Sequence, residues 1–528
     1  MNATGYHTHP GPPDAAGRHM PVFGPAFGRW SLLLVAMPGL LLAVALLMLV
    51  QAGYTGEDDA HYLFAADGWL SGQWFLGVNH WHLRHPHVLA IAGSFALFGR
   101  HEWAMMLPTV VAFLGVILLT CWLIRRVADE LTAIFAGLLV AATPVFVFYA
   151  KVPYPDINEL FCCVLSFVLM WKGLETARYR WFILSGLVMG VAWLIRPSCA
   201  PLILLYGLLF LIGYRVPRPR YLSMGIGFAP LILAEWAYYF LRAGDPFYRF
   251  AVDMRSLEIS TAHMVGGVAH GLRPPFNIAL MAKWVPNSLV DVHWLVNPYI
   301  DFLTSPSYGF LYLAAIVAAV VLLRDGRSSR PDTRAFVRMM IALALLWIFV
   351  TIYVLNLRPQ PRYFLPATWS ACLLVAMGLR HMLQRKGWGW AALLLALLVI
   401  IDIALASARK YPMEAERELA VFVASHDGPL ATDLLKARFF LEERGLVDRV
   451  TFIDEGRMPP AGVFLTASDH LESWSAKDIS GFRPVPAPSS WSDSVWATIV
   501  PQKIYTKLRP RRDLMLVHLP AEGHRAVF

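Results

Sequence analysis

The feature that most constrains this chain is a series of eleven apolar runs of about 15 to 21 residues. A helix needs about 20 mostly apolar residues to cross the hydrocarbon core of a bilayer, where its backbone must satisfy its own hydrogen bonds. Hydrophobic residues make up 57% of the 528 residues and charged residues only 15%, which excludes a soluble enzyme, a disordered chain and a fibre. The sequence predicts an α-helical polytopic membrane protein with spans near 31–51, 104–124, 131–150, 157–171, 181–195, 199–213, 222–241, 307–323, 339–356, 363–380 and 388–408.

The basic residues indicate how these helices are oriented. If residues 1–30 form a cytoplasmic tail, every loop expected on the cytoplasmic side is basic, as the positive-inside rule requires. This predicts an odd number of spans and an external C-terminal region. Orientation then explains the net charge of +9, so no nucleic-acid partner is expected. The basic residues of these loops are Arg125 and Arg126; Lys172, Arg178 and Arg180; Arg215, Arg218 and Arg220; Arg324, Arg327, Arg330, Arg334 and Arg338; and Arg380, Arg385 and Lys386.

Two long connections, 52–103 and 243–306, are expected on the outer side. In the first, apolar residues recur at helical spacing from Tyr62 to Trp69, which predicts a short amphipathic helix on the membrane surface. Residues 86–99 are apolar but too short to span comfortably, so a second interfacial helix is expected there.

The C-terminal part is richer in charged residues and predicts a separate domain. We expect a transmembrane domain over 31–408 and a small external α/β domain over 409–528, with helices near 413–425 and 433–445. The stretch 481–493 is expected to be a loop. The expected strands are 429–432, 449–454, 462–467, 495–500 and 514–519.

Neither the cysteines nor the histidines form a recognisable metal site. The five cysteines lie in apolar runs without a CxxC pair, so no disulfide framework is predicted. His80, His82, His85 and His87 lie among aromatic residues, and their spacing, without acid or thiol partners, is not that of a zinc site. Interfacial packing is the favoured interpretation, with substrate contact by His85 or His87 next. No cofactor is predicted, and a divalent metal is left open.

Acidic residues occur at two places on the expected outer face. Glu57, Asp58 and Asp59 stand at the start of the first surface helix, and Asp156 follows Pro155 where another helix begins. Adjacent carboxylates repel one another, so at least one pKa in the first group should rise, which suits a general base acting on a hydroxyl. Each acid could also simply cap its helix. Two acidic positions on one face favour a site.

Three arginines on the outer side are not explained by orientation. Arg196 lies in a short turn, and Arg358 and Arg362 lie in a Pro-rich connection between two spans. Guanidinium groups beside the outer leaflet suit the recognition of a phosphate. The alternative is that each side chain reaches out to the lipid headgroups.

Five short motifs follow one another along the chain in an order that resembles a known family. They are Asp58-Asp59-Ala60-His61-Tyr62, His85-Pro86 leading to LFG at 97–99, Trp103 to Pro108, Tyr154-Pro155-Asp156, and Arg362-Tyr363-Phe364-Leu365-Pro366. In this order they resemble the GT-C glycosyltransferases that take a sugar from a polyprenyl phosphate, namely the protein O-mannosyltransferases and the lipid A aminoarabinose transferases. The resemblance extends over nearly the whole chain.

The resemblance implies roles for these residues. Asp58 would be the catalytic carboxylate, with Asp59 beside it where the family usually has Glu. Asp156 would be a second acid that orients or activates the acceptor. The donor phosphate would be held by arginines and the substrate by aromatic and histidine side chains. These are Arg362, Arg358 and Arg196 for the phosphate, and Tyr62, His61, His85, Tyr154 and Tyr363 for the substrate.

The expected function is therefore transfer of a sugar from a polyprenyl phosphate to a hydroxyl or phosphate of an envelope glycolipid, polysaccharide or protein, with inversion. The protein is expected in the bacterial inner (plasma) membrane, with its active site and C-terminal domain facing the periplasm or exterior. The alternative is a transporter or flippase of lipid-linked sugars, although transporters place ionisable groups near the midplane and often within repeated halves. A third possibility is a lipid-binding subunit without turnover.

Overall fold

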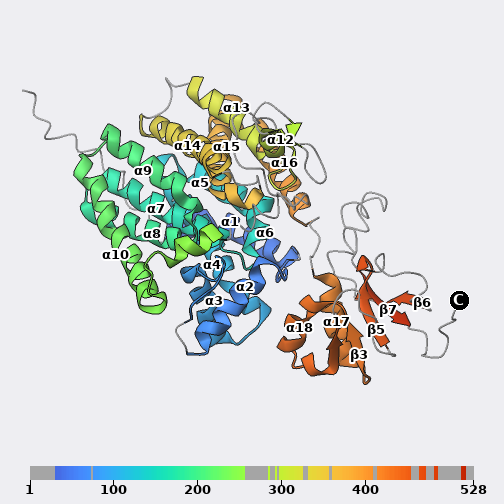
Figure 1. The fold of residues 1–528 in the computed structure, drawn as a ribbon. Coiled ribbons are helices and arrows are strands. Elements are labelled where there is room, and N and C mark those ends of the chain that lie inside the picture. The colour runs from blue at the N-terminus through green and yellow to red at the C-terminus, as the bar shows by residue number, and fades with distance from the viewer. Residues whose placement is uncertain are drawn as a thin grey trace, which may run out of the picture.

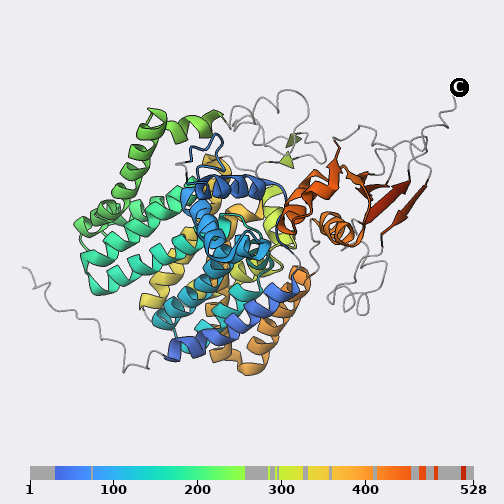
Figure 2. The same ribbon diagram turned by 90° about the horizontal axis from the view of Figure 1, so that it is seen from below.

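The protein is described by a computed structural model, in which a bundle of helices carries a small sheet at one side (Figure 1). The same arrangement is seen after a quarter turn (Figure 2). The described residues are 30–50, 52–72, 75–255, 284–285, 292–293, 297–324, 331–355, 360–407, 413–453, 463–470, 481–485 and 513–518.

Each of the eleven predicted apolar runs contains a helix, so the prediction of a multi-pass membrane protein is confirmed. Within the described residues, seven helical segments are long and apolar enough to cross a membrane, and a pair of helices bent by 61° is an eighth candidate. The seven are α1 (Trp30–Leu49), α4 (Glu102–Val127), α7 (Asp156–Thr176), α10 (Arg218–Ala243), α14 (Pro331–Phe349) with the π-helical η3 (Val350–Val354), η4 (Pro361–Phe364) with α15 (Leu365–Lys386), and α16 (Trp388–Ser407). The bent pair is α5 (Glu130–Ala142) and α6 (Pro144–Ala150), and the shorter helices are α8 (Tyr179–Ile195), η1 (Pro197–Cys199) with α9 (Ala200–Ile212), and α13 (Leu311–Arg324).

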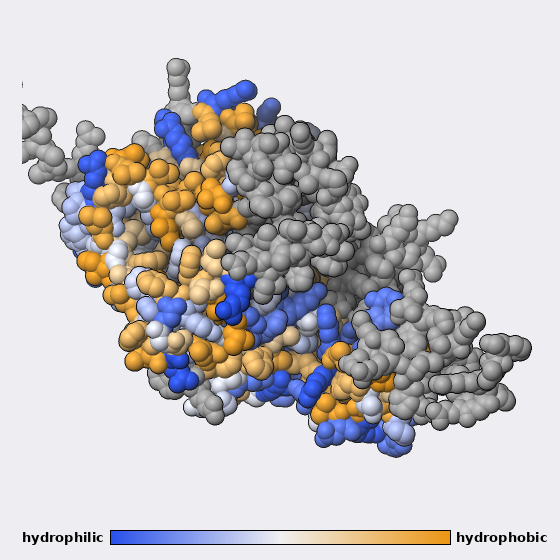
Figure 3. All heavy atoms as spheres, viewed as in Figure 1, coloured by the Kyte–Doolittle hydropathy of each residue, from blue (hydrophilic) through white to orange (hydrophobic). Residues whose placement is uncertain are grey.

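Helix α15 lies at the centre of the bundle and packs against α5, α7, α13, α14 and α16. Small residues allow these close approaches: a Cβ atom added at Gly378 would lie 2.6 Å from the Cβ atom of Ala318 on α13. Trp369 is fully buried in the same helix, and its indole N–H donates to Thr120 at 2.8 Å. By contrast, apolar residues cover much of the described surface of the bundle on the face seen in Figure 3, as expected where helices face lipid.

The two helices predicted in the connection between α1 and α4 are present. Helix α2 (Asp58–Leu70) buries Tyr62, Ala65 and Ala66 on one face, and α3 (His85–Phe98) packs between α2 and α4. The connection between α10 and α13 is described only in parts. These parts are helical residues 248–255, β1 (Trp284–Val285) paired antiparallel with β2 (Val292–His293), and α12 (Asn297–Thr304).

The described residues of the C-terminal region form a five-stranded mixed sheet with the order β4-β3-β5-β7-β6. Strand β3 pairs in parallel with β4 and β5, whereas β7 pairs antiparallel with β5 and β6. Four predicted strands and both predicted helices are confirmed, and 495–500 lies outside the described residues. The elements are α17 (Glu414–Ser425), β3 (Leu430–Thr432), η5 (Leu435–Ala437), α18 (Arg438–Glu443), η6 (Val447–Arg449), β4 (Val450–Phe452), β5 (Val463–Ala467), β6 (Gly481–Pro484) and β7 (Leu514–His518).

The expectation of a loop over 481–493 is wrong at its start, because β6 occupies Gly481–Pro484. Glycine and proline argue against a central strand, since proline removes a ladder donor. Among the described strands, β6 lies at the edge of the sheet and pairs only with β7, and an edge strand tolerates such residues.

Candidate active site

The acids and arginines of the site stand where helices begin, and a proline marks several of these starts. Asp58 is the first residue of α2, Asp156 the first residue of α7, and Arg196 directly precedes η1. Arg362 lies in η4, which leads into α15. Proline favours a first helical turn, and the N-terminus of a helix carries partial positive charge that suits anions. We call this the site end of the bundle, and the opposite end of α15, at Lys386, the far end.

Asp58 and Arg362 form an ion pair across 304 positions of sequence. Arg362 Nη1 donates to Asp58 Oδ2 at 2.7 Å, and the two side chains are 17% and 19% exposed. Burial alone would raise the pKa of Asp58, but the charges of Arg362, Arg84 and Arg196 outweigh it and hold the pKa below its ordinary value. Asp58 is therefore ionised at neutral pH and still accessible.

A second pair, Asp156 and Arg196, is buried more deeply. Arg196 Nη1 donates to Asp156 Oδ1 at 2.5 Å, and the Asp156 side chain is only 1% exposed. Among the described residues, Asp156 Oδ2 has no hydrogen-bond partner. One turn further along α7, buried Glu159 accepts a hydrogen bond from Ser198 at 2.7 Å, beside Arg196.

Tyrosine rings join the two pairs into one cluster. The Arg196 guanidinium lies 4.5 Å from the ring centre of Tyr363, and that of Arg362 lies 5.3 Å from the same ring. Arg362 also lies 5.4 Å from the ring centre of Tyr154. These distances suit cation–π contact. Two carboxylates and two guanidinium groups from four separate parts of the sequence therefore share one site.

Asp59 is fully buried and holds the segment before α2. Its carboxylate accepts hydrogen bonds from Thr55 N, from Thr55 Oγ1 at 2.9 Å and from Glu57 N at 2.8 Å. Thr55 Oγ1 in turn lies 3.0 Å from the Tyr154 hydroxyl. The pKa of Asp59 is raised to about 6, so one pKa in the acidic trio does rise. The main cause is burial rather than the expected repulsion between carboxylates.

The C-terminal region also contacts this segment. Tyr54 N donates to Glu102 at 2.9 Å, and Arg417 of α17 pairs with the same carboxylate. The ring of Tyr54 lies 4.3 Å from that of Phe439 on α18. At Gly56, where φ is +66°, an added Cβ atom would lie 2.7 Å from Lys436. The chain leading to Asp58 is thus clamped from outside the bundle.

The substrate-binding candidates occupy different surroundings. Tyr62 is buried and its hydroxyl accepts from Arg84, whereas His61 is half-buried and stacks on Trp81 with ring centres 4.4 Å apart. His85 points toward α10, where its Nε2 lies 2.7 Å from the Tyr239 hydroxyl. Tyr154 and Tyr363 lie against the arginines as described above. Arg358 lies outside the described residues.

His87, the other histidine of the motif, is a buried structural link. Its Nε2 lies 3.1 Å from the Pro153 carbonyl and its Nδ1 lies 2.9 Å from Asn158 Nδ2. A carbonyl only accepts and an amide nitrogen only donates, so the ring is neutral with its proton on Nε2. Burial accordingly lowers the pKa of His87 to about 3. The link ties α3 to the segment that carries Asp156.

Three polar residues of the cluster were not foreseen. Arg84 is buried and contacts Tyr62, and Glu159 and Thr55 contact Ser198 and Asp59 as described. Position offers the only signal: Arg84 precedes the His85-Pro86 motif, and Glu159 stands one helical turn after Asp156. Within the part of the chain that the structure describes, no three His, Cys, Asp or Glu side chains are grouped as metal ligands. The geometry therefore assigns no residue to a metal or cofactor.

The arrangement of helices in this bundle is similar to that of the GT-C glycosyltransferases. ArnT from Cupriavidus metallidurans, solved bound to undecaprenyl phosphate, has the same fold with a TM-score of 0.52 and 14% identity. The match covers 94% of this chain and 99% of that chain. The chain therefore has the GT-C fold, and the resemblance expected from the sequence is confirmed.

Two sequence comparisons agree with the fold. Residues 85–238 match the family model described as dolichyl-phosphate-mannose-protein mannosyltransferase. The protein named "Putative mannosyltransferase YkcB" from Bacillus subtilis (strain 168) is 30% identical over 117 residues. That match covers 22% of this chain and 16% of the relative's length. Both matches involve less than a third of the chain.

Proposed function

We propose that this protein is a membrane glycosyltransferase that transfers a sugar from a polyprenyl phosphate to an acceptor hydroxyl on the outer face of the membrane. The observation that carries the proposal is the Asp58–Arg362 pair, which places an ionised, accessible carboxylate beside a guanidinium group at 2.7 Å. Undecaprenyl phosphate bound to ArnT, which has the same fold, supports this class of donor. The acceptor is an envelope glycolipid, polysaccharide or protein.

Asp58 acts as the general base and Arg362 binds the donor phosphate. In the free protein Arg362 holds the pKa of Asp58 low, which makes Asp58 a weak base. When the donor phosphate binds Arg362, Asp58 loses its main counter-charge, and the proton affinity of Asp58 rises. Asp58 then accepts the proton of the acceptor hydroxyl as the oxygen attacks the anomeric carbon. The sugar–phosphate bond breaks with inversion, and arginine stabilises the charge on the departing phosphate.

The other candidate residues support this chemistry. Arg196, and Arg358 on the connection before η4, supply further positive charge for the phosphate. Buried Asp156 orients Arg196 through the 2.5 Å hydrogen bond. Asp59 acts through Thr55, because it fixes the segment that leads to Asp58. Tyr62, His61, His85, Tyr154 and Tyr363 shape the donor and acceptor sites.

The orientation follows from the basic loops. Residues 1–30 form a cytoplasmic tail, 31–408 the transmembrane catalytic domain and 409–528 an outer domain that holds the segment before α2. The far end of the bundle, rich in arginine and lysine, then faces the cytoplasm as the positive-inside rule requires. The site end faces the periplasm or exterior.

The function is tested by mass spectrometry of envelope glycolipids and glycoproteins from cells that lack the protein. Wild-type protein should restore a missing glycan, and Asp58→Asn should lower its rate of formation by about 10²–10⁴-fold, the usual contribution of general acid–base catalysis. Asp67→Asn is the matched control, because Asp67 lies on the same helix and pairs with Arg100 away from the cluster. Full restoration by Asp58→Asn would remove the catalytic assignment and favour a transporter or flippase.

A further inference from the structure

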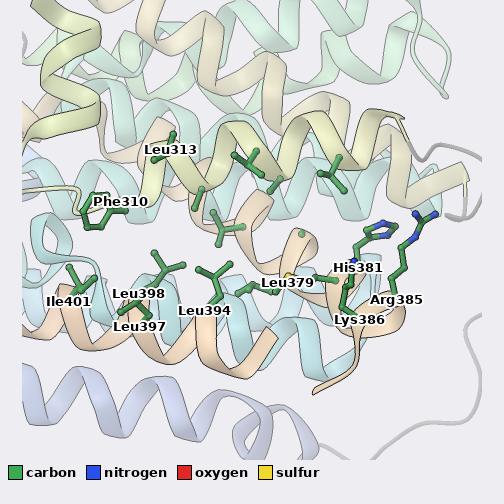
Figure 4. Close-up of a pocket in the computed structure, with 17 residues that line it drawn as sticks. Phe310, Leu313, Leu379, His381, Arg385, Lys386, Leu394, Leu397, Leu398 and Ile401 are labelled. Atoms are coloured by element: carbon green, nitrogen blue, oxygen red, sulfur yellow. The ribbon is translucent and has the colours of Figure 1, made fainter. Parts of the chain in front are cut away.

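A groove between three helices lies away from the charged cluster. Helices α13 and α16 each pack against α15, and the groove runs between them with α15 as its floor (Figure 4). Its volume is about 540 Å³. All but three of its lining residues are apolar or glycine, and several, such as Leu313, Val317 and Leu397, are about half exposed. The groove is therefore open to the lipid that surrounds the bundle.

The three exceptions stand together at one end. His381, Arg385 and Lys386 lie at one end of the row of lining residues, and Phe310 and Ile401 lie at the other (Figure 4). Among the described residues that line the groove, none is acidic. An apolar trough that ends in positive charge complements a molecule with a hydrocarbon chain and an anionic head.

The length of the groove matches one leaflet. Its lining on α15 runs from Val375 to Lys386, which is about 17 Å at 1.5 Å per residue. Half of a hydrocarbon core is about 15 Å. Trp388 and Trp390, beyond the basic end, are 64% and 66% exposed, as is usual for aromatic residues at a membrane–water interface. The basic end therefore lies at the level of the headgroups.

This end is remote from the candidate active site. Arg362 lies in η4, just before α15, and Lys386 is the last residue of α15, so the 22 residues of this helix, about 32 Å in length, separate the two. One phosphate cannot contact both. The groove thus belongs to the leaflet at the far end, whereas the donor phosphate of the proposed reaction would be at the site end.

We propose that the groove is a binding site for an anionic phospholipid of the far-end leaflet. One acyl chain lies between α13 and α16, and the phosphate lies against Arg385 and Lys386. The lipid fills the groove between two helices that each pack against α15, and so stabilises the bundle. The proposal rests on the groove alone and holds whether or not the protein transfers sugars.

Native mass spectrometry of the purified full-length protein tests it, after incubation with phosphatidylglycerol or phosphatidylcholine. The wild type should retain one phosphatidylglycerol at least about tenfold better than phosphatidylcholine. Arg385→Gln/Lys386→Gln should lose this preference. Val317→Trp, at an exposed lining position, should reduce retention of both lipids by filling the groove. The matched control is Lys172→Gln/Arg180→Gln, which removes two charges near the far end on other helices and should bind like the wild type.

The proposal would be overturned by equal retention of the two lipids by the wild type, by unchanged retention in both groove variants, or by the same loss in the control. Undecaprenyl phosphate serves as competitor. It should leave phosphatidylglycerol in place, because its phosphate is expected at the site end. Stoichiometric displacement would show that the groove holds the donor's chain instead and would contradict the assignment.

Discussion

The two ends of the helical bundle both carry arginine–acid pairs, but in different environments. At the site end, the side chains of Arg362–Asp58 and Arg196–Asp156 are between 1% and 19% exposed. At the far end, those of Arg380–Asp129, Arg126–Glu175 and Arg215–Asp332 are between 17% and 39% exposed. Arginine–acid pairs are thus more deeply buried at the site end than at the far end.

Burial changes what such a pair signifies. Removing two charges from water costs several kcal/mol per ion, and the attraction between them does not reliably offset this. Partly solvated pairs cost little and contribute little. The arginines of the far-end pairs are explained by the positive-inside rule. The buried pairs at the site end contribute little to the stability of the fold once the cost of desolvation is subtracted. We therefore assign the chemistry to that end.

The largest expected effect on stability follows from breaking the more buried pair. Asp156→Asn leaves the Arg196 charge almost buried without its counter-charge, and loss of one partner of a buried pair typically costs about 3–5 kcal/mol. Thermal unfolding in one detergent should show this as a clear fall in Tm. An unchanged Tm would mean that Arg196 is well solvated or that another acid, such as neighbouring Glu159, replaces Asp156.

A smaller effect is expected where the C-terminal region clamps the segment before α2. Arg417→Ala removes the partner of Glu102, whose carboxylate holds Tyr54 N. Less exact placement of Asp58 should lower kcat by about tenfold or less, with little change in KM for the donor. Arg444→Ala, an exposed change in the same region, is the control. Equal kcat values for the two variants would show that the clamp does not position the site.

The pH dependence of activity should follow the ionisation of Asp59 rather than that of Asp58. The ionised form of Asp59 accepts the hydrogen bonds that fix Thr55 and Glu57, so activity should rise as pH passes about 6. Because this pKa lies above the ordinary value of 3.8, the folded state binds the proton more tightly, and the free energy of unfolding should fall as pH rises from about 4 to about 6.

Profiles of transfer rate and Tm against pH for the wild type and Asp59→Asn check both statements. In Asp59→Asn the rise in activity near pH 6 should disappear. If the same rise persists in that variant, another group controls it and the role given to Asp59 is wrong.

The smallest effect is expected at the far end. Arg380→Gln removes a pair whose side chains are 29% and 37% exposed, and pairs of this kind are worth about 0–1 kcal/mol. Tm should fall by a few degrees at most and the transfer rate should not change. A loss comparable to that of Asp156→Asn would erase the distinction between the two ends.

Much of the fold could be predicted from the sequence because its signals are local. Twenty apolar residues identify a span wherever it packs, and the Tyr62–Trp69 spacing identified α2 as a helix with one buried face. Pairing between distant segments has no such local signal. Strand β6 forms because β7 lies beside it, although its own Gly and Pro favour a loop.

The site shows the same limit. Sequence motifs indicated Asp58, Asp156 and Arg362 as candidates, and a position in a short turn indicated Arg196. No spacing rule, however, pairs residues 304 positions apart. The distinct situation of Asp59 depends on Thr55 folding back on it, and that of Arg84 depends on Tyr62. The groove was not foreseen at all, because it is formed by the packing of α13 and α16 against α15.

In the proposed reaction Arg362 binds the donor phosphate, and Asp58 pairs with Arg362 only in the free protein. Binding of undecaprenyl phosphate to the purified wild type, Asp58→Asn and Arg362→Ala tests this directly. Asp58→Asn should bind at least as tightly as the wild type, because Arg362 is released from its counter-charge, and Arg362→Ala should bind at least about tenfold more weakly, given about 1.5–3 kcal/mol for a hydrogen bond to a charged group. Equal weakening in both variants, or none in Arg362→Ala, would contradict the account.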